Sequence, residues 1–469
     1  MAVKLRRPIL MGGVGLSFAL WVLQGWHHAV AKLGEFSLAG AIAVIVCLWV
    51  FQQYKVKDVA NPPENAPLDK AGVEKAIASA EGVINQLATE ALNHQLNSQL
   101  QQKLAQVKTE IDRQEIHSCV TGGKAVGKTT LIQVLETWES PIASLCLRET
   151  PALLTENDAW QQTITSDLVM FITNGDLTDS EFQALQQIAA QQRLILVFNK
   201  QDQYLPDEKV TVLNSLQQRV QPLLRLEDVV AISASPSRIK VRQHQADNSV
   251  QEWMEQRSPE VTQLTQQLEQ IIVQEGQQLV WTTTKRAAEN LKVEAKTALN
   301  QIRRDRAVPA IEQYQWIAAA AAFANPVPAL DLLATAAINA QMVMDLGGIY
   351  QQKLSLQQAQ AVAGTMGNLM LKLGLVELST KAIGTVLKSN AITFVAGGVV
   401  QGVSAAYLTR LAGLTLIEYF QQQEIDAATG LSFDKLGQTL QKVFQQNQQL
   451  GFLQGFVKQS VGRLLPEAS

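Results

Sequence analysis

The first 57 residues consist of two apolar runs with short charged flanks. Residues 9–23 contain no charge, and residues 36–51 follow directly on Glu35. Each run is slightly shorter than the ~20 residues of a transmembrane helix, but flanking Trp and Gln residues can lie at the interfaces. Because Lys4, Arg6 and Arg7 precede the first run and Lys55 and Lys57 follow the second, residues 1–57 are predicted to form a membrane hairpin with both ends in the cytoplasm. The alternative is a cleaved signal peptide, since residues 29–31 resemble a cleavage site.

A polar segment with a regular apolar stripe comes next. Residues 58–66 include Pro62 and Pro63 and are predicted to be a linker. From Val73 to Ile111, apolar residues recur at spacings of three and four, which predicts one long amphipathic helix. Residues 58–115 are therefore assigned to a linker and a stalk helix. Packing on the next domain is favoured over a free coiled coil, because the heptad register drifts.

Between residues 116 and 276 short apolar runs alternate with amphipathic stretches. Five runs are predicted to be buried strands, at residues 116–120, 144–148, 167–173, 194–198 and 229–232. The alternation predicts an α/β domain with a doubly wound, mostly parallel sheet that helices cover on both faces. Thr178 and Glu181 have the spacing of a capping box, and Ser258-Pro259 predicts another helix start.

The pattern after residue 276 is helical throughout. We predict a connecting helix over residues 277–310 and an all-α apolar domain over residues 311–469. Residues 389–409 carry no charge and are long enough to span a membrane. Polar residues such as Asn390 and Gln401 also suit a tightly packed soluble bundle, and this second interpretation is favoured.

Composition narrows the classes of partner. Charged residues make up 17% of the chain, below the roughly 25% of soluble domains, which is consistent with membrane contact. The 39 Lys and Arg residues against 42 Asp and Glu residues give a net charge of -3, so no nucleic-acid partner is predicted. The three cysteines, Cys47, Cys119 and Cys146, lack the sequence spacing of a disulfide framework or a zinc site.

A phosphate-binding motif follows the first predicted strand and opens a helix. The motif G-x-x-x-x-G-K-[ST] comprises Gly122, Gly123, Lys124, Ala125, Val126, Gly127, Lys128 and Thr129. Its glycines let backbone N–H groups approach phosphate oxygens, and the helix N-terminus favours their negative charge. Lys128 is expected to reach the β and γ phosphates, Thr129 to supply a hydroxyl to Mg²⁺, and Thr130 to complete the phosphate site.

A second motif follows the strand predicted at residues 194–198. In Asn199-Lys200-Gln201-Asp202, the carboxylate of Asp202 can accept hydrogen bonds from N1–H and the exocyclic amine of guanine, which adenine does not offer. Asn199 can bond the base and tie loops together, and the stem of Lys200 can lie across the ring. Ser233, Ala234 and Ser235 follow the last strand and could donate a backbone N–H to the guanine carbonyl.

The order of these motifs resembles the Era-like branch of small GTPase domains, over about residues 116–274. The resemblance implies a P-loop NTPase fold, bound GTP or GDP, and Mg²⁺. Where that branch has D-T-P-G, this chain has Glu149-Thr150-Pro151-Ala152, so Glu149 is either the support for Mg²⁺ beside Thr129 or a surface carboxylate. Only 20 residues separate Lys128 from Glu149, which leaves no room for the first switch loop and its edge strand. Lys128 and Thr129 therefore remain the candidate catalytic groups, and tight binding is expected more than fast hydrolysis.

Residues 311–420 resemble the YcjF-type helical domain of unknown function, on the segments 316–323, 325–333, 339–342 and 401–410. Together these features predict a multi-pass membrane protein with its nucleotide domain on the cytoplasmic side. We expect a GTP-binding switch with weak or partner-dependent hydrolysis, whose state is read by a protein partner or by self-association. The alternative is a hydrolysis-deficient membrane scaffold that holds nucleotide as a structural ligand.

Overall fold

The computed structural model describes residues 68–91, 96–138, 145–152, 157–244, 250–324, 328–389, 398–422, 432–447, 455–457 and 459. The membrane hairpin predicted over residues 1–57 lies outside these ranges. Among the described residues, no single helix is long and apolar enough to cross a membrane. One bent pair, residues 356–372 with 375–385, passes the same test only when both helices are taken together.

Five parallel strands form the central sheet. They are β1 (Ile116–Gly122), β2 (Leu145–Glu149), β3 (Leu168–Thr173), β4 (Arg193–Phe198) and β5 (Val229–Ala231). Their order in the sheet is β2-β1-β3-β4-β5, and every pair is parallel. The predicted mostly parallel sheet is thus confirmed. Within the described residues β2 has β1 as its only neighbour, so this edge carries no antiparallel strand there.

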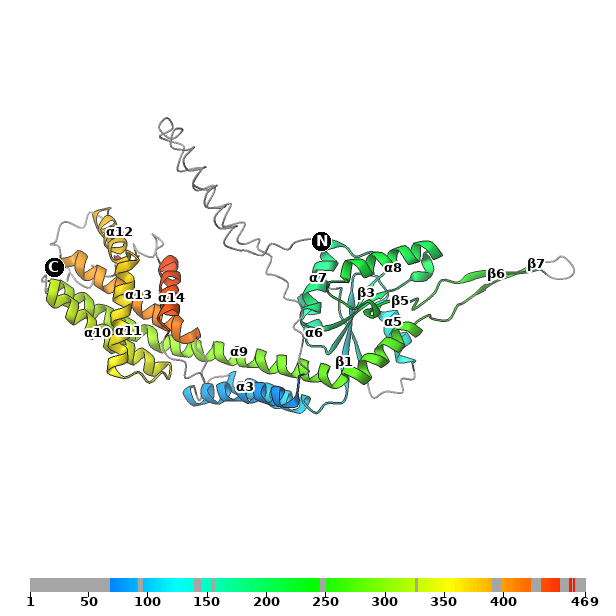
Figure 1. The fold of residues 1–469 in the computed structure, drawn as a ribbon, viewed down its shortest axis with the longest axis horizontal. Coiled ribbons are helices and arrows are strands. Elements are labelled where there is room, and N and C mark those ends of the chain that lie inside the picture. The colour runs from blue at the N-terminus through cyan, green and yellow to red at the C-terminus, as the bar shows by residue number, and fades with distance from the viewer. Residues whose placement is uncertain are drawn as a thin grey trace, which may run out of the picture. The chain divides into compact units, whose positions relative to one another are not determined.

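Helices cover both faces of this sheet (Figure 1). They are α5 (Lys128–Glu136), α6 (Asn157–Ile164), α7 (Asp179–Ala189), α8 (Pro206–Val220) and the first part of α9 (Thr262–Ala324). Leu131 of α5 and Leu264 of α9 are buried in one core with Ile172 of β3. On the opposite face, Leu185 of α7 and Leu216 of α8 are buried in a second core. Continuous apolar strands such as β3, buried at all six positions, are what a sheet covered on both faces requires.

An antiparallel hairpin extends away from the sheet (Figure 1). Strands β6 (Ile239–His244) and β7 (Val250–Glu255) pair only with each other, and the short helices η2 (Gln201–Gln203) and η3 (Leu226–Asp228) precede them. Ser233 and Glu260 exchange backbone hydrogen bonds at the base of the hairpin. That bridge keeps the chain extended beyond Ser258-Pro259, so the next helix begins at Thr262. The sequence analysis did not predict this hairpin.

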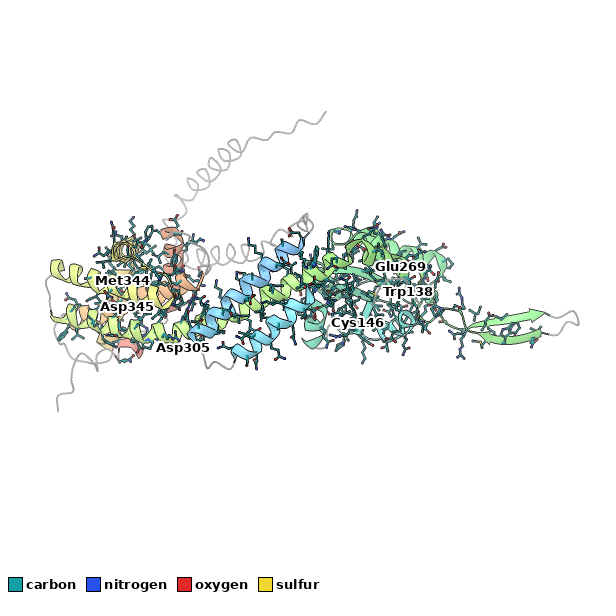
Figure 2. All side chains as sticks on the ribbon, turned by 90° about the horizontal axis from the view of Figure 1, so that it is seen from below. Trp138, Cys146, Glu269, Asp305, Met344 and Asp345 are labelled. Atoms are coloured by element: carbon teal, nitrogen blue, oxygen red, sulfur yellow. The ribbon has the colours of Figure 1, made fainter. Side chains whose placement is uncertain are left out.

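The described part of the stalk contains two helices where one long helix was predicted. Helix α3 (Lys70–Glu90) ends at Ala91, and α4 (Leu96–Glu110) begins beyond it. Both helices pack along α9, as Figure 2 shows. Their apolar stripe is buried against the middle of α9, with the members Val73, Ile77, Ile84, Leu87, Leu100, Leu104, Ala288, Leu291, Ala295 and Leu299. The predicted packing of the stripe is present, but it is divided between two helices.

Helix α9 contributes to one core of the sheet domain, to the stalk and to the C-terminal bundle. It has 63 residues, which at ~1.5 Å per residue gives a length of about 95 Å. Leu268 packs on the sheet, Leu291 in the stalk and Ile311 in the C-terminal bundle. The boundaries predicted after residues 276 and 310 both fall inside this continuous helix. Pro309 lacks the N–H for one helical hydrogen bond, and the buried neighbours Ala307 and Ile311 offset that loss by packing.

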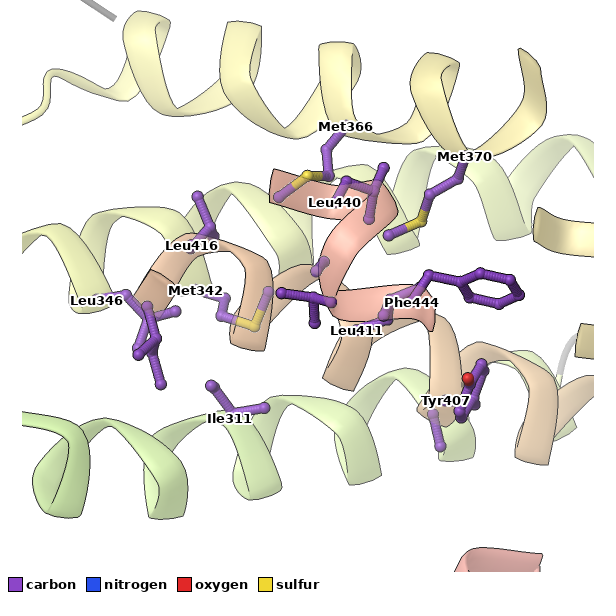
Figure 3. Packing of buried hydrophobic residues seen from close by; sticks show 14 of the residues in the cluster. Ile311, Met342, Leu346, Met366, Met370, Tyr407, Leu411, Leu416, Leu440 and Phe444 are labelled. Atoms are coloured by element: carbon purple, nitrogen blue, oxygen red, sulfur yellow. The ribbon is translucent and has the colours of Figure 1, made fainter. Parts of the chain in front are cut away.

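The described C-terminal residues form an all-helical bundle with the end of α9. Its helices are α10 (Pro328–Ile349), α11 (Leu356–Lys372), α12 (Leu375–Ser389), α13 (Gly398–Gln422) and α14 (Phe433–Asn447). Figure 3 shows Met342, Met366, Leu411 and Leu440 directed into a common core. Tyr407 is 2% exposed, and α13 packs most extensively on α9. The described part of the uncharged segment 389–409 thus has the packed arrangement favoured for it.

Close packing of α13 on α9 depends on Gly413. A Cβ atom at this position would lie 2.6 Å from Cγ1 of Ile311. Gly413→Ala is therefore expected to destabilise the bundle by about 1–2 kcal/mol, because overpacking outweighs the gain in helix propensity. The matched control is Gly384→Ala in α12, where the new methyl group meets no atom within 4 Å and should stabilise the helix slightly.

Native-state hydrogen exchange of α13 amides would measure this local stability separately from the sheet. Faster exchange is expected in Gly413→Ala and not in Gly384→Ala. In an Ile311→Ala background the clash is absent, so Gly413→Ala should cause no additional loss. Equal exchange rates in the wild type and Gly413→Ala would contradict the packing argument.

Candidate functional site

The loop predicted to bind phosphate, here named the phosphate loop, connects β1 to α5 at the carboxyl edge of the sheet. Gly122 has φ of 144° and Gly127 has φ of 96°, conformations that favour glycine. A Cβ atom on Gly122 would lie 2.2 Å from the carbonyl oxygen of Ile172. On Gly127 it would lie 2.4 Å from Nδ2 of Asn199. Both glycines are therefore required by close contacts with β3 and with the Asn199 loop.

Lys128 is the first residue of α5 and its side chain lies inside this loop. The residue is 8% exposed, and Nζ donates a hydrogen bond to the carbonyl oxygen of Gly123 at 2.9 Å. Burial lowers the pKa of Lys128, and the nearby negative charge of Glu149 partly opposes this change. An ammonium group that is partly desolvated gains more from an anion than an exposed one. The position suits a group that binds phosphate.

Thr129 and Glu149 come together at the ends of α5 and β2. Oγ1 of Thr129 donates to the carboxylate of Glu149, at 2.8 Å from Oε2 and 3.0 Å from Oε1. The next residue, Thr150, donates its backbone N–H to the carbonyl oxygen of Val120, which holds the end of β2 beside β1. A hydroxyl and a carboxylate at this separation are oxygen ligands of the kind that Mg²⁺ prefers. The two predicted metal residues are thus adjacent.

Asn199 connects the phosphate loop to the loop after β5. Its Nδ2 donates to the carbonyl oxygen of Val126 at 2.9 Å, and its Oδ1 accepts from the backbone N–H of Ala234 at 3.0 Å. Lys200 has φ of 61°, and its Nζ donates to the carbonyl oxygen of Ala125 at 2.9 Å. One buried amide therefore holds three chain segments that are far apart in the sequence. Asn199 fits the predicted role of tying the loops together.

Asp202 lies beside the same loops in the short helix η2. Its Oδ2 accepts a hydrogen bond from the backbone N–H of Ser237 at 2.9 Å. Its Oδ1 is buried and has no hydrogen-bond partner among the described residues. Burial opposes ionisation of this carboxyl group, but hydrogen bonds from Ser237 outweigh it and lower the pKa of Asp202. An ionised carboxylate with one unpaired oxygen is suited to accept hydrogen bonds from a ligand.

A backbone amide of the Ser233-Ala234-Ser235 segment was predicted to donate to the guanine carbonyl, but two of these amides bond to the protein itself. The backbone N–H of Ser233 donates to Glu260, and that of Ala234 donates to Asn199. Two of the three candidate donors for a base carbonyl are therefore engaged in fixing the loop itself. Oγ of Ser233 is buried and has no hydrogen-bond partner among the described residues, so this loop still offers a polar atom to the site.

The sequence analysis did not assign Ser237 or Glu181 to the site, although both lie near it. The Ser237 amide contacts Asp202 only because the chain turns after β5, and no motif marks that turn. Glu181 belongs to the capping box with Thr178, which the sequence did predict. The structure also places its carboxylate beside the phosphate loop, where a Cβ atom on Gly123 would lie 2.9 Å from Oε1.

The bundle contains a cavity of about 450 Å³ between α10, α11, α12 and α13. Its lining is mostly apolar and includes Met342, Met366 and Leu408. The hydroxyl oxygens of Ser404 and Thr409, which also line it, have no hydrogen-bond partner among the described residues. None of the described residues that line it is titratable.

Comparison with known protein families gives a match for one part of the chain. Residues 286–449 match the family model of DUF697, a domain of unknown function. The match begins inside α9 and includes the bundle helices up to α14. No curated protein matches this chain. The C-terminal region is therefore similar to a recognised helical family, and that family brings no assigned chemistry.

Two solved structures resemble the chain weakly over most of its length. The bacterial dynamin GTPase LeoA from ETEC has 10% sequence identity and a TM-score of 0.25, over 84% of this chain and 98% of LeoA. A chain of an oligomerised bacterial dynamin pair, reported as a mechanism for long-range sensing and tethering of membranes, has 14% identity and a TM-score of 0.23, over 84% of this chain and 81% of its own. Scores this low establish no shared fold, so the inferences below rest on the residues of this chain.

Proposed function

We propose that this protein binds GTP or GDP with Mg²⁺ at the carboxyl edge of its sheet and acts at a membrane as a nucleotide-dependent switch. The observation that carries the proposal is the pair of hydrogen bonds by which Asn199 donates to the phosphate loop and accepts from the loop after β5. These bonds hold the loop that would bind the phosphates beside the loops that would bind the base. Open α/β sheets bind ligands at this edge.

Each residue of the site fits a part of such a ligand. The backbone amides of the loop and Nζ of Lys128 suit the phosphates, because charge-assisted hydrogen bonds to phosphate are strong. Thr129 and Glu149 would hold Mg²⁺, which neutralises phosphate charge when bound. The unpaired Oδ1 of Asp202 suits the donors on the Watson–Crick edge of guanine. Adenine offers no such pair of donors there, so guanine is the favoured base.

Hydrolysis is expected to be slow or to depend on a partner. Phosphoryl transfer needs a positioned water and donors that stabilise charge in the transition state. Lys128 and Thr129 can contribute to this stabilisation. The chain has Ala152 where the resembled family has glycine, and we assign no residue to the orientation of water. A partner protein or a second copy of this chain could supply the missing group.

Membrane attachment through residues 1–57 completes the proposal. Two apolar runs flanked by basic residues support an anchor that keeps the nucleotide domain on the cytoplasmic side. Extraction of membranes with alkaline carbonate tests this part, because an integral hairpin stays in the pellet. Release of the protein into the supernatant would contradict it.

The alternative function is a membrane scaffold with nucleotide as a permanent structural ligand. It is favoured by the direct contact of Thr129 with Glu149 and by the continuity of α9 from the sheet domain through the stalk to the bundle. A switch requires different affinities for GTP and GDP, because a ligand pair with equal affinity shifts no conformational equilibrium. The two functions therefore differ in the ratio of the affinities for GTP and GDP, which can be measured.

Equilibrium binding and turnover on the full-length protein in detergent would separate them. For a switch, we expect saturable Mg²⁺-dependent binding of GTP and GDP with affinities that differ at least about tenfold, much weaker ATP binding and slow turnover. Glu149→Gln should weaken the Mg²⁺ dependence, whereas the exposed control Glu136→Gln should not. Equal affinities without turnover would support the scaffold. Absence of guanine-nucleotide binding would refute both functions.

A further inference from the structure

Three ligand-type side chains meet at the amino ends of β1 and β2. A carboxylate oxygen of Glu115, a ring nitrogen of His117 and Sγ of Cys146 all lie within 4.8 Å of one another. Glu115 and His117 are two residues apart, so they point to the same face of the extended chain. Cys146 is the partner of His117 in the parallel register of β1 and β2. The cluster therefore results from strand pairing and lies at the edge of the sheet opposite to the phosphate loop.

The donor atoms of this cluster suit a borderline transition metal. Zn²⁺ binds thiolate sulfur, imidazole nitrogen and carboxylate oxygen with bonds of about 2.0–2.3 Å, which in tetrahedral geometry puts the donors roughly 3.5 Å apart. The donors in the structure lie within 4.8 Å of one another, so metal binding would draw them closer together. Mg²⁺ and Ca²⁺ prefer oxygen ligands alone, so thiolate and imidazole disfavour them here. The proposed Mg²⁺ site at Thr129 has oxygen donors and is chemically distinct.

The backbone around two of the ligands is held by a buried ion pair. The side chain of Asp167 is 0% exposed, and it pairs with Arg113 at 2.8 Å. Asp167 also accepts a hydrogen bond from the backbone N–H of His117 at 2.8 Å. Arg113 in turn donates to the carbonyl oxygen of Glu115. These contacts hold Glu115 and His117 in place before any metal binds, as the outer contacts of metal sites do.

We propose that Glu115, His117 and Cys146 form a site for one Zn²⁺ ion, with water as the fourth ligand. The ion would join the edge strand β2 to β1 at the start of both strands. Glu149 is three residues beyond Cys146 on β2, about 10 Å along the strand. A metal at Cys146 would thus stabilise the strand that presents Glu149 to Thr129. The proposal is independent of nucleotide binding.

Cobalt substitution tests the site directly on the full-length protein in detergent, in a Cys47→Ser background. Co²⁺ bound to a thiolate gives sulfur-to-metal absorption in the near ultraviolet, which oxygen and nitrogen ligands alone do not give. We expect one Co²⁺ per chain with this band, displaced by Zn²⁺. Cys146→Ser should abolish the band, and His117→Ala should weaken metal binding at least about tenfold. Cys119→Ala is the matched control and should leave the band unchanged.

Thiol alkylation gives a second measurement that needs no variant at the site. Cys146 is half-buried, so a thiol reagent should modify it in metal-free protein, and Zn²⁺ should slow that reaction at least about tenfold. Cys119 should stay unreactive in both cases, because its side chain is fully buried and the reagent cannot reach it. Lys128→Ala should leave the Co²⁺ band intact. Absence of the band in the wild type, its survival in Cys146→Ser, or equal alkylation rates with and without Zn²⁺ would overturn the proposal.

Discussion

Lys128→Ala is expected to lower the affinity for GDP and GTP by a factor on the order of 100 or more. The side chain lies inside the phosphate loop, with Nζ at 2.9 Å from the carbonyl oxygen of Gly123. Its removal deletes charge-assisted hydrogen bonds to phosphate, each of about 1.5–3 kcal/mol, from a partly desolvated site. Titration of the full-length protein with a fluorescent guanine nucleotide measures the change.

The matched control for this variant is Lys124→Ala. Lys124 belongs to the same loop, but its side chain is exposed. Its removal should change affinity only slightly and mainly at low salt, because an exposed charge is screened. Equal losses in both variants would mean that the loop attracts nucleotide by net charge alone. Unchanged affinity in Lys128→Ala would refute the phosphate site.

Asp202→Asn is expected to reverse the choice of base. The carboxylate of Asp202 only accepts hydrogen bonds, whereas the side-chain amide of asparagine also donates them through its N–H₂ group. Guanine presents donors at N1 and at its exocyclic amine. The N–H₂ group of the asparagine would therefore face the donors of the exocyclic amine and could not bond to them. Xanthine has a carbonyl oxygen in place of that amine and can accept from the amide. Loss of GDP binding on the order of 100-fold or more and a gain in xanthosine diphosphate binding are therefore expected.

This substitution preserves the structural contact of the residue. The carbonyl oxygen of asparagine can still accept from the Ser237 amide, which Asp202 now binds at 2.9 Å. Asp207→Asn, at the exposed start of α8, is the control and should change neither affinity. Competition between GDP and xanthosine diphosphate for one preparation of the protein gives the ratio of the two affinities directly. An unchanged ratio in Asp202→Asn would exclude Asp202 as the residue that recognises the base.

The two strongest motifs could be located in the sequence because their residues are close together in the chain. The loop from Gly122 to Thr129 follows a strand and opens a helix, as its spacing predicted. The capping box at Thr178 is likewise present, because its hydrogen bonds span only three residues. Local hydrogen bonding and the alternation of apolar residues depend on neighbours within a few positions. Sequence patterns report such features well.

Longer segments show where the local pattern of apolar residues was insufficient to predict the ends of helices. The apolar stripe from Val73 to Ile111 has helical spacing throughout, yet α3 ends at Ala91, and both α3 and α4 pack on α9. The stripe identifies which side chains are buried and does not indicate what buries them. Similarly, α9 continues through Pro309, where a boundary was predicted nearby. Tertiary packing on both sides offsets the local cost of proline.

The sequence by itself determined the five strands and their alternation with helices, the loop from Gly122 to Thr129 and the place of Asn199 and Asp202 after β4, since each depends on residues that are neighbours along the chain. Only the tertiary structure decided the contact of Thr129 with Glu149 and the cluster that contains Cys146. The spacing of the cysteines along the chain had argued against a zinc site. These contacts arise from the register between strands, which side-chain packing and backbone hydrogen bonds across the whole sheet select together.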